Sequence, residues 1–187
     1  DSTLTGFWYA NDFEGDLGDE WINGGLDTTP SGQRKFLGRF GQREVRLVLL
    51  GLPKHDQVRV SFDLFAIGAL TGNELTQDGW SMAVDDPTQI AINTNFNNAS
   101  DQFDLHPQAY PGNTPNVHPA RTGAAENDTL GYAHDAVYPI TVTFDHNSKS
   151  LVLIFTGVAP GWGDTTQKSW GLDDIEVLGK TKDTDWP

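Results

Sequence analysis

The sequence predicts an all-β fold, an antiparallel β-sandwich of the jelly-roll kind with a long ordered loop region. Three observations predict it: apolar and polar residues alternate in several short runs, turn-forming residues separate the runs, and no stretch repeats apolar residues at helical spacing. The chain has 187 residues, with 20 Gly and 10 Pro available for turns. We expect a single domain over residues 1–179, followed by a linker over residues 180–187.

The predicted strands differ in how clearly they alternate. In the run 57–67, apolar residues at 58, 60, 62, 64 and 66 share one face, and polar residues occupy the start of the other. Alternation of this kind is typical of a strand with one face in the core and one in solvent. The predicted strands, in chain order, are Glu44–Leu50, Gln57–Ile67, Trp80–Val84, Gln89–Asn93, Tyr138–Asp145, Leu151–Phe155 and Ile175–Leu178.

A long segment between the predicted strands, Thr94–Ala136, has little strand character and is rich in Asn, Pro, Gly and Asp. Loops of this length in a domain are usually functional or disordered. Apolar and aromatic residues at intervals favour an ordered loop that is held against the sandwich. These residues are Phe96, Phe103, Leu105, Tyr110, Leu130 and Tyr132.

The charge of the chain restricts its partners. It carries 26 acidic and 12 basic side chains, for a formal net charge of −14 at pH 7, which argues against nucleic acid as a partner. No run of about 18 apolar residues is present, so membrane insertion is not expected. Cysteine is absent, which excludes a disulfide framework.

The acidic residues concentrate in the middle of the chain, where eleven Asp and Glu between Arg59 and Lys149 face one basic residue, Arg121. Cations that bind oxygen would relieve the repulsion, so several calcium ions are the expected cofactor. The alternative is that these acids only solvate the surface.

The two chain ends carry the first candidate metal site. Asp12 and Glu14 lie near the start, and Asp173 lies near the end. First and last strands of a sandwich often lie side by side, which would bring Glu14 opposite Asp173. A calcium ion between two such carboxylates would tie the ends together. Otherwise they are ordinary polar residues at strand ends.

The motif DFEG at residues 12–15, with LDDI at residues 172–175, resembles calcium-stabilised jelly rolls such as MAM domains and many carbohydrate-binding modules. A wider set of motifs resembles the peptide-binding domain of giant calcium-dependent RTX adhesins of Gram-negative bacteria. These motifs are FLGRFG at Phe36–Gly41, VRVSFDLF at Val58–Phe65, DGWSMAVD at Asp78–Asp85, LGYAHDAVY at Leu130–Tyr138 and SWGLDDIEV at Ser169–Val177.

The resemblance implies a calcium-dependent adhesion domain outside the cell, at the cell surface. Its expected ligand is the C-terminal carboxylate of a cell-surface peptide on a host or partner cell, and calcium at the loop end is expected to bind that carboxylate. The domain would be a monomeric module within a longer chain. The alternative function is a calcium-stabilised lectin or carbohydrate-binding module that binds a glycan.

The second candidate site combines loop carboxylates with aromatic residues. Asp78, Asp101, Asp104 and Asp135 bracket the long loop and its neighbouring strand. A calcium ion held by such residues, with an open coordination position, would accept an anionic ligand despite the negative charge of the protein. The alternative for any one of them is that its carboxylate caps a turn.

Four residues are candidate ligand contacts. Trp80 precedes the long loop and Tyr132 lies within it, and Trp162 lies between two glycines with Asp164 close behind. An aromatic ring can offer a flat apolar face to a sugar or peptide. The alternatives are that Trp80 is a core residue and that Trp162 folds back as a lid on the sandwich.

Catalysis is not predicted. The stretch Glu14–Glu20 is one residue too long for the Glu-x-Asp-x-x-Glu signature of laminarinase-type glycosidases, and two glycines interrupt it. Neither a Gly-x-Ser-x-Gly nucleophile motif nor a His-Glu-x-x-His zinc motif occurs.

Overall fold

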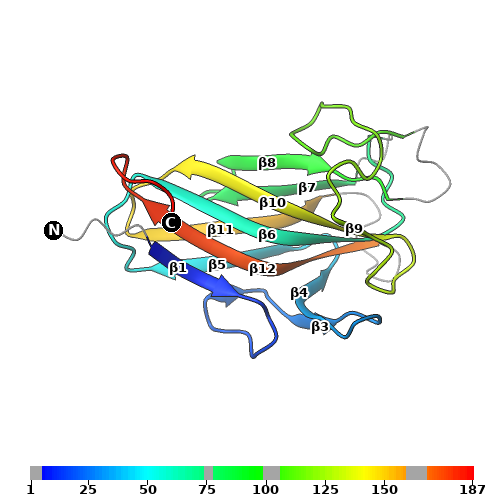
Figure 1. Cartoon of the computed structure of the whole chain (residues 1–187), viewed down its shortest axis with the longest axis horizontal. Helices are drawn as coiled ribbons and strands as arrows, with labels where there is room; N and C mark the ends of the chain where they lie inside the picture. Colours follow the sequence, from blue (N-terminus) through cyan, green and yellow to red (C-terminus); the bar gives the residue numbers. More distant parts are fainter. Residues whose placement is uncertain (1–5, 74–77, 99–105, 159–167) are drawn as a thin grey trace.

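The computed structural model describes residues 6–73, 78–98, 106–158 and 168–187. Two antiparallel sheets face each other and form the predicted all-β sandwich, a jelly roll (Figure 1). Within these ranges, no helix has the length and apolar character that a membrane crossing requires.

The larger sheet has seven strands in the order β3-β4-β12-β6-β10-β9, with β1 also paired to β12. The long strands β6 and β10 pair from Ile67 opposite Asp135 to Gln57 opposite Asp145. The strands of this sheet are β1 (Gly6–Asn11), β3 (Leu26–Thr28), β4 (Lys35–Phe40), β6 (Gln57–Gly68), β9 (Glu126–Asn127), β10 (Asp135–Asp145) and β12 (Lys168–Lys180).

The smaller sheet has five strands in the order β2-β5-β11-β7-β8. The strand β8 forms one edge of this sheet, and the long loop covers that edge. The backbone N–H of Thr114, in the loop, donates to the carbonyl of Asn93 at 2.8 Å. Covering an edge in this way prevents pairing with another chain. The strands of this sheet are β2 (Trp21–Ile22), β5 (Glu44–Leu50), β7 (Gly79–Val84), β8 (Ile90–Asn95) and β11 (Ser150–Val158).

The alternation along β6 explains how the core forms. Its residues at 58, 60, 62 and 64 are buried, whereas those at 57, 59, 61 and 63 are only half-buried on the outer face. Opposite them, Trp80 lies 5.8 Å from Phe62 and 6.1 Å from Trp170 between ring centroids. Large aromatic rings from both sheets therefore fill the centre of the sandwich.

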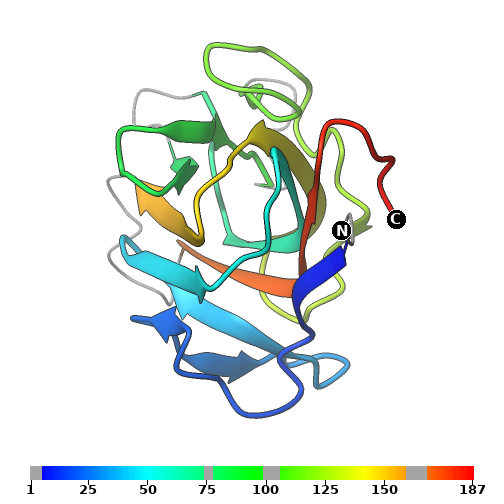
Figure 2. The ribbon, with the colours of Figure 1, turned by 90° about the vertical axis from the view of Figure 1, so that its left-hand side faces the viewer.

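The sandwich has two ends that differ in composition. The terminal end carries the turns at residues 51–56, 85–89 and 146–149, the start of β1 and the C-terminal segment, and Figure 2 views it directly. The opposite end, here called the loop end, carries the turn at residues 41–43 and the long loop (Figure 1).

The described part of the long loop is ordered by buried amides as well as by aromatic rings. The side chain of Gln108 is fully buried, and its Oε1 accepts hydrogen bonds from the backbone N–H groups of Asn97 and Arg121 and from the Tyr138 hydroxyl. Tyr110 lies 5.4 Å from Tyr138 between ring centroids. The side-chain amide of Gln108 thus links three segments of the chain, as hydrogen bonds between paired strands do elsewhere in the sandwich.

The predicted bounds need correction in two places. The loop expected over Thr94–Ala136 is shorter, because β8 continues to Asn95, β10 begins at Asp135, and β9 lies within it. The sequence reading also missed β1, β2, β3 and β4, all before residue 41. Phe103 and Leu105, expected to hold the loop, lie outside the described residues.

The C-terminal segment expected as a linker, residues 180–187, is folded against the larger sheet. Lys180 is the last residue of β12. The ring of Trp186 lies 4.1 Å from the Arg59 guanidinium carbon and 5.2 Å from the Lys180 amine, so two cations lie over one indole.

Candidate functional site

The two chain ends lie side by side, as the sequence predicts. β1 pairs antiparallel with β12, with Ala10 opposite Glu176. A cleft of about 500 Å³ lies there, lined by Ala10, Asn11, Asp12, Asp174, Ile175 and Glu176. Its carboxylates come from Asp12, Asp174 and Glu176, whereas the sequence reading placed Glu14 opposite Asp173.

The carboxylates of Glu14 and Asp173 have different partners. A Glu14 carboxylate oxygen accepts a hydrogen bond from the backbone N–H of Lys35 at 3.1 Å. Asp173 is 4% exposed and pairs with the Arg34 guanidinium at 3.2 Å. Burial and the neighbouring charge of Asp174 raise the pKa of Asp173 to about 6, despite that pairing.

Arg34 is the centre of an acidic cluster on the outer face of the larger sheet. Its guanidinium also pairs with Glu126 at 3.0 Å and lies over the ring of Phe65. Asp63 is opposite Asp173 across the β6–β12 ladder. Burial raises the pKa of Asp63, and the charge of Asp174 raises it further. One cation therefore faces several carboxylates.

Asp78 is fully buried at the start of β7. Its Oδ2 accepts hydrogen bonds from the backbone N–H of Thr71 at 2.8 Å and from the Lys168 amine at 2.8 Å. Its Oδ1 has no partner among the described residues. Lys168 therefore supplies a counter-charge at the position where the sequence predicted calcium.

Asp135 organises the turn that precedes β10. Its side chain is fully buried, and its two carboxylate oxygens accept the backbone N–H groups of Thr129, Leu130 and Tyr132 at 2.9, 3.1 and 3.0 Å. The side chain thus caps a turn. This is the alternative weighed against metal binding for each aspartate.

The turn that Asp135 caps places Tyr132 in a cleft at the loop end. The cleft measures about 410 Å³ and is lined by Arg39, Ile67, Gly68, Ala69, Tyr132, Ala133 and His134. The Arg39 guanidinium carbon lies 4.7 Å from the Tyr132 ring centroid, and Arg39 Nε donates to the Ser169 hydroxyl at 3.1 Å. Three elements far apart in sequence therefore position the aromatic ring and the cation.

The half-buried Tyr132 keeps its hydroxyl protonated at neutral pH. Burial raises the pKa of the phenol, and the nearby charge of Asp27 raises it further. The cleft therefore offers a neutral aromatic ring, a guanidinium and an imidazole beside the aliphatic wall of Ile67. Such a mixture of flat apolar surface and a few polar groups is typical of a small-ligand site.

The structure corrects the ligand-binding assignment of Trp80. Its side chain is fully buried in the core of the sandwich, because it lies on the inner face of β7 against Phe62 and Trp170. Sequence reasoning missed Arg39 as a site residue. It lies in β4, which was not recognised as a strand, and only the fold brings it to Tyr132.

Four predicted site residues lie outside the described residues: Asp101, Asp104, Trp162 and Asp164. Within the part of the chain that the structure describes, no three His, Asp or Glu side chains are grouped so that they could hold a metal ion. The described residues alone therefore do not form a calcium cage, and calcium stays a prediction.

No protein-family model matches the chain, and no curated protein matches it. Among solved structures, dimeric latent PorU from Porphyromonas gingivalis is similar at 15% identity and a TM-score of 0.49. That match covers 89% of this chain and 14% of PorU, so the chain spans about a seventh of that protein.

Two carbohydrate-binding modules are similar over most of their own length. The xylan-binding CBM22-1 domain from Paenibacillus barcinonensis matches at 12% identity and a TM-score of 0.45, covering 97% of this chain and 99% of that one. A family 35 module from Clostridium thermocellum matches at 10% identity and a TM-score of 0.41, covering 84% and 88%. These values describe a loose likeness of architecture. The fold assignment rests on the two sheets themselves.

Proposed function

We propose that the chain is a non-catalytic ligand-binding module that binds a glycan in the Tyr132 cleft. The observation that supports the proposal is that hydrogen bonding and packing hold both the backbone and the ring of Tyr132 in place. Its backbone N–H is held by Asp135, and its ring lies against the Arg39 guanidinium. A preformed aromatic surface loses little entropy when a sugar ring stacks on it.

The chemistry of the cleft fits a sugar. The faces of sugar rings carry C–H groups that pack on an aromatic ring, while the hydroxyls at the ring edge need donors and acceptors. Arg39 and His134 supply polar groups at the side of the cleft, and Ile67 supplies an apolar wall. The turn that carries Tyr132 stays in place because Asp135 satisfies its backbone.

A second candidate is the binding of a peptide through its C-terminal carboxylate. The presence of Arg39 and His134 in one cleft favours it, since a guanidinium binds a carboxylate through two hydrogen bonds. In that case the module would act as an adhesion domain outside the cell, with calcium as a further ligand-binding group. Peptide capture by an adhesion domain is therefore the alternative to glycan binding.

The test compares Tyr132→Ala with Phe7→Ala on a glycan array, followed by calorimetric titration of any glycan that binds. Phe7 is 64% exposed and lies on β1, so its variant removes an exposed aromatic ring elsewhere. We expect Tyr132→Ala to weaken binding by about 10-fold or more, as loss of a stacked aromatic ring does. Phe7→Ala should bind as the unmodified chain does.

Peptides with a free C-terminus and the same peptides as C-terminal amides separate the two candidates. Binding of the free acids alone, with no glycan bound, would overturn the glycan proposal in favour of peptide capture. Measurable hydrolysis of any bound glycan would contradict the non-catalytic assignment.

A further inference from the structure

Two buried histidines at the terminal end form a continuous hydrogen-bonded chain. His55 Nδ1 lies 2.6 Å from the Pro53 carbonyl oxygen, and His55 Nε2 lies 2.6 Å from His146 Nδ1. His146 Nε2 lies 3.1 Å from the Asp85 carboxylate. The two ring planes are 14° from parallel and their centroids lie 4.9 Å apart. Because the facing nitrogens are only 2.6 Å apart, the rings meet edge to edge.

The three contacts determine how many protons the two rings carry. A carbonyl oxygen only accepts a hydrogen bond, so His55 Nδ1 carries a hydrogen. The ionised Asp85 also only accepts, so His146 Nε2 carries another. The contact between the two rings needs one more, whichever nitrogen holds it. Two neutral imidazoles carry only two such hydrogens, and the pair therefore holds one extra proton and one positive charge.

The surroundings isolate this charge from water but leave it one neutralising partner. His55 and His146 are 2% and 9% exposed. Trp8 packs against His55 at 4.5 Å and Phe144 against His146 at 6.4 Å between ring centroids. Asp85, the partner, has a second oxygen that accepts the backbone N–H of Val152 at 2.9 Å.

The other charged groups on the elements around the pair belong to the same turns, to the start of β6 and to the end of β12, and β1 contributes none. Asp145 lines a cleft of about 310 Å³ together with Asp85 and His146, and that cleft gives solvent a path to the Asp85 end of the chain. The remaining charged groups are Lys54, Asp56, Asp86, Lys149 and Lys180, together with Arg59 near the start of β6.

A metal ion between the rings is the alternative to a shared proton. The outer nitrogen of each ring is hydrogen-bonded to an acceptor, as in metal-bound histidines. A zinc ion, however, lies about 2.0–2.1 Å from each nitrogen, which separates the two nitrogens by about 3.3 Å at a tetrahedral angle. The observed 2.6 Å suits a hydrogen bond and is too short for that geometry.

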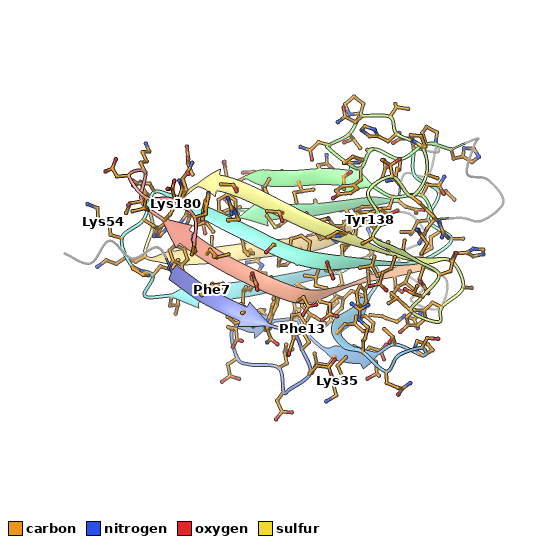
Figure 3. All side chains as sticks on the ribbon, viewed as in Figure 1. Phe7, Phe13, Lys35, Lys54, Tyr138 and Lys180 are labelled. Carbon is orange, nitrogen blue, oxygen red and sulfur yellow. The ribbon has the colours of Figure 1, made fainter. Side chains whose placement is uncertain are left out.

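We propose that His55 and His146 share one extra proton and act as a pH-dependent latch between the turns of the terminal end and the C-terminal tail. The turn with His55 also holds the tail, because the backbone N–H of Asp56 donates to the Lys180 carbonyl and the Asp56 carboxylate accepts the N–H of Lys182, both at 2.9 Å. Lys54 and Lys180 lie at this same end (Figure 3).

The latch opens in both directions of pH. Loss of the shared proton leaves two nitrogen lone pairs facing each other, and gain of a second one leaves two N–H groups facing each other. Either state loses the central hydrogen bond. The contact between residues 146–149 and residues 51–56 then rests on two backbone hydrogen bonds, from Leu52 N–H to Lys149 and from His146 N–H to Asp56, and is weakened. The closed state therefore has its optimum at an intermediate pH, and the contact between the two turns weakens on either side of it.

The direct test is nitrogen NMR of the histidine-labelled, unmodified chain across pH. We expect three protonated ring nitrogens among the four of this pair at the pH of maximum stability, and a hydrogen bond between the rings. Two protonated nitrogens at that pH, or one equivalent of tightly held metal that is lost in His146→Gln, would overturn the proposal.

A second measurement follows melting temperature and hydrogen exchange with pH in His146→Gln and in the control His118→Gln. His118 lies in the long loop, away from the pair. In the unmodified chain and the control, exchange of residues 51–56 and 181–186 should be slowest at the same intermediate pH, and that minimum should vanish in His146→Gln. An unchanged minimum in His146→Gln would refute the latch.

Discussion

At the scale of single residues, the hydroxyl of Tyr9 joins three elements. It accepts hydrogen bonds from Trp21 Nε1 at 2.7 Å and Asn11 Nδ2 at 2.9 Å, and it donates to Glu20 at 2.8 Å. Trp21 is 6% exposed. Removal of the hydroxyl therefore leaves a buried indole N–H without its acceptor. We expect Tyr9→Phe to lower the free energy of unfolding by about 1–3 kcal/mol in urea titrations at pH 7.

The pH dependence of the same residue gives an independent check. Burial raises the pKa of Tyr9 to about 12, above the value of about 10 in an unfolded chain. The stability that depends on the neutral phenol is therefore complete below about pH 10 and lost as pH rises toward about 12. The control is Tyr110→Phe, whose hydroxyl makes one exposed bond, to Pro139. Equal losses in both variants would contradict this account.

Aspartates show what can be predicted about single residues from sequence. Their abundance indicated calcium, yet Asp12, Asp86 and Asp135 each accept backbone N–H groups of their own turns. Asp residues cap turns and bind calcium for the same reason, a short side chain with two oxygens. The residue type therefore fits both roles, and only the neighbouring chain decides between them.

At the scale of elements, the turn at residues 128–134 depends on one carboxylate. Asp135→Ala removes the acceptor of three backbone N–H groups, and we expect it to cost about 2–4 kcal/mol. Hydrogen exchange should rise in this turn before the rest of the sandwich is affected, and ligand binding in the Tyr132 cleft should weaken. Asp135→Asn, which keeps one acceptor oxygen, should lose about half as much. A uniform rise in exchange across the chain would argue against a local role.

Among the strands that were predicted correctly, β6 and β10 have unambiguous alternation, whereas the segment Leu151–Phe155 within β11 is a continuous apolar run. β6 and β10 pair with each other over their whole length. In the half of each strand whose outer face reaches solvent, every second residue is apolar. β1 and β4 were missed because Trp8 and Tyr9 are adjacent aromatics, and Phe36 and Leu37 are both buried. A strand covered on both faces, such as β4, has no polar alternation to recognise. In β1, the adjacent half-buried aromatics interrupt the alternation.

The candidate site was predicted only in part, for a related reason. Tyr132 was recognised because an aromatic residue stands out in a polar loop. Arg39 and His55 gave no signal, since each depends on a partner far along the chain: Tyr132 for Arg39, and His146 for His55. Pairings of that kind arise from sheet topology, which no local pattern encodes.

At the scale of the whole molecule, the negative charge is unevenly compensated. Arg34 pairs with two carboxylates, Glu126 and Asp173, while Lys168 serves Asp78. Burial first, and then the charge of Asp174, raise the pKa values of Asp63 and Asp173, so the ionised forms of these two carboxylates are disfavoured in the folded chain. Added cations should therefore stabilise the fold, either by general screening or by binding at specific positions.

Thermal unfolding in calcium and in EDTA distinguishes these two effects. Extracellular calcium sites have dissociation constants of about 10⁻⁴–10⁻³ M, so 10 mM calcium would add about 1.4–2.7 kcal/mol. We expect a rise in melting temperature of about 3–10 °C over the EDTA sample. Sodium chloride at equal ionic strength should give a smaller rise, because screening has no saturable site. If sodium chloride reproduces the full shift, the acids are only screened, and the calcium prediction is wrong. A shift specific to calcium that disappears in Asp78→Asn but persists in Asp183→Asn, an exposed tail variant, would instead place an ion beside Asp78 Oδ1, which has no partner among the described residues.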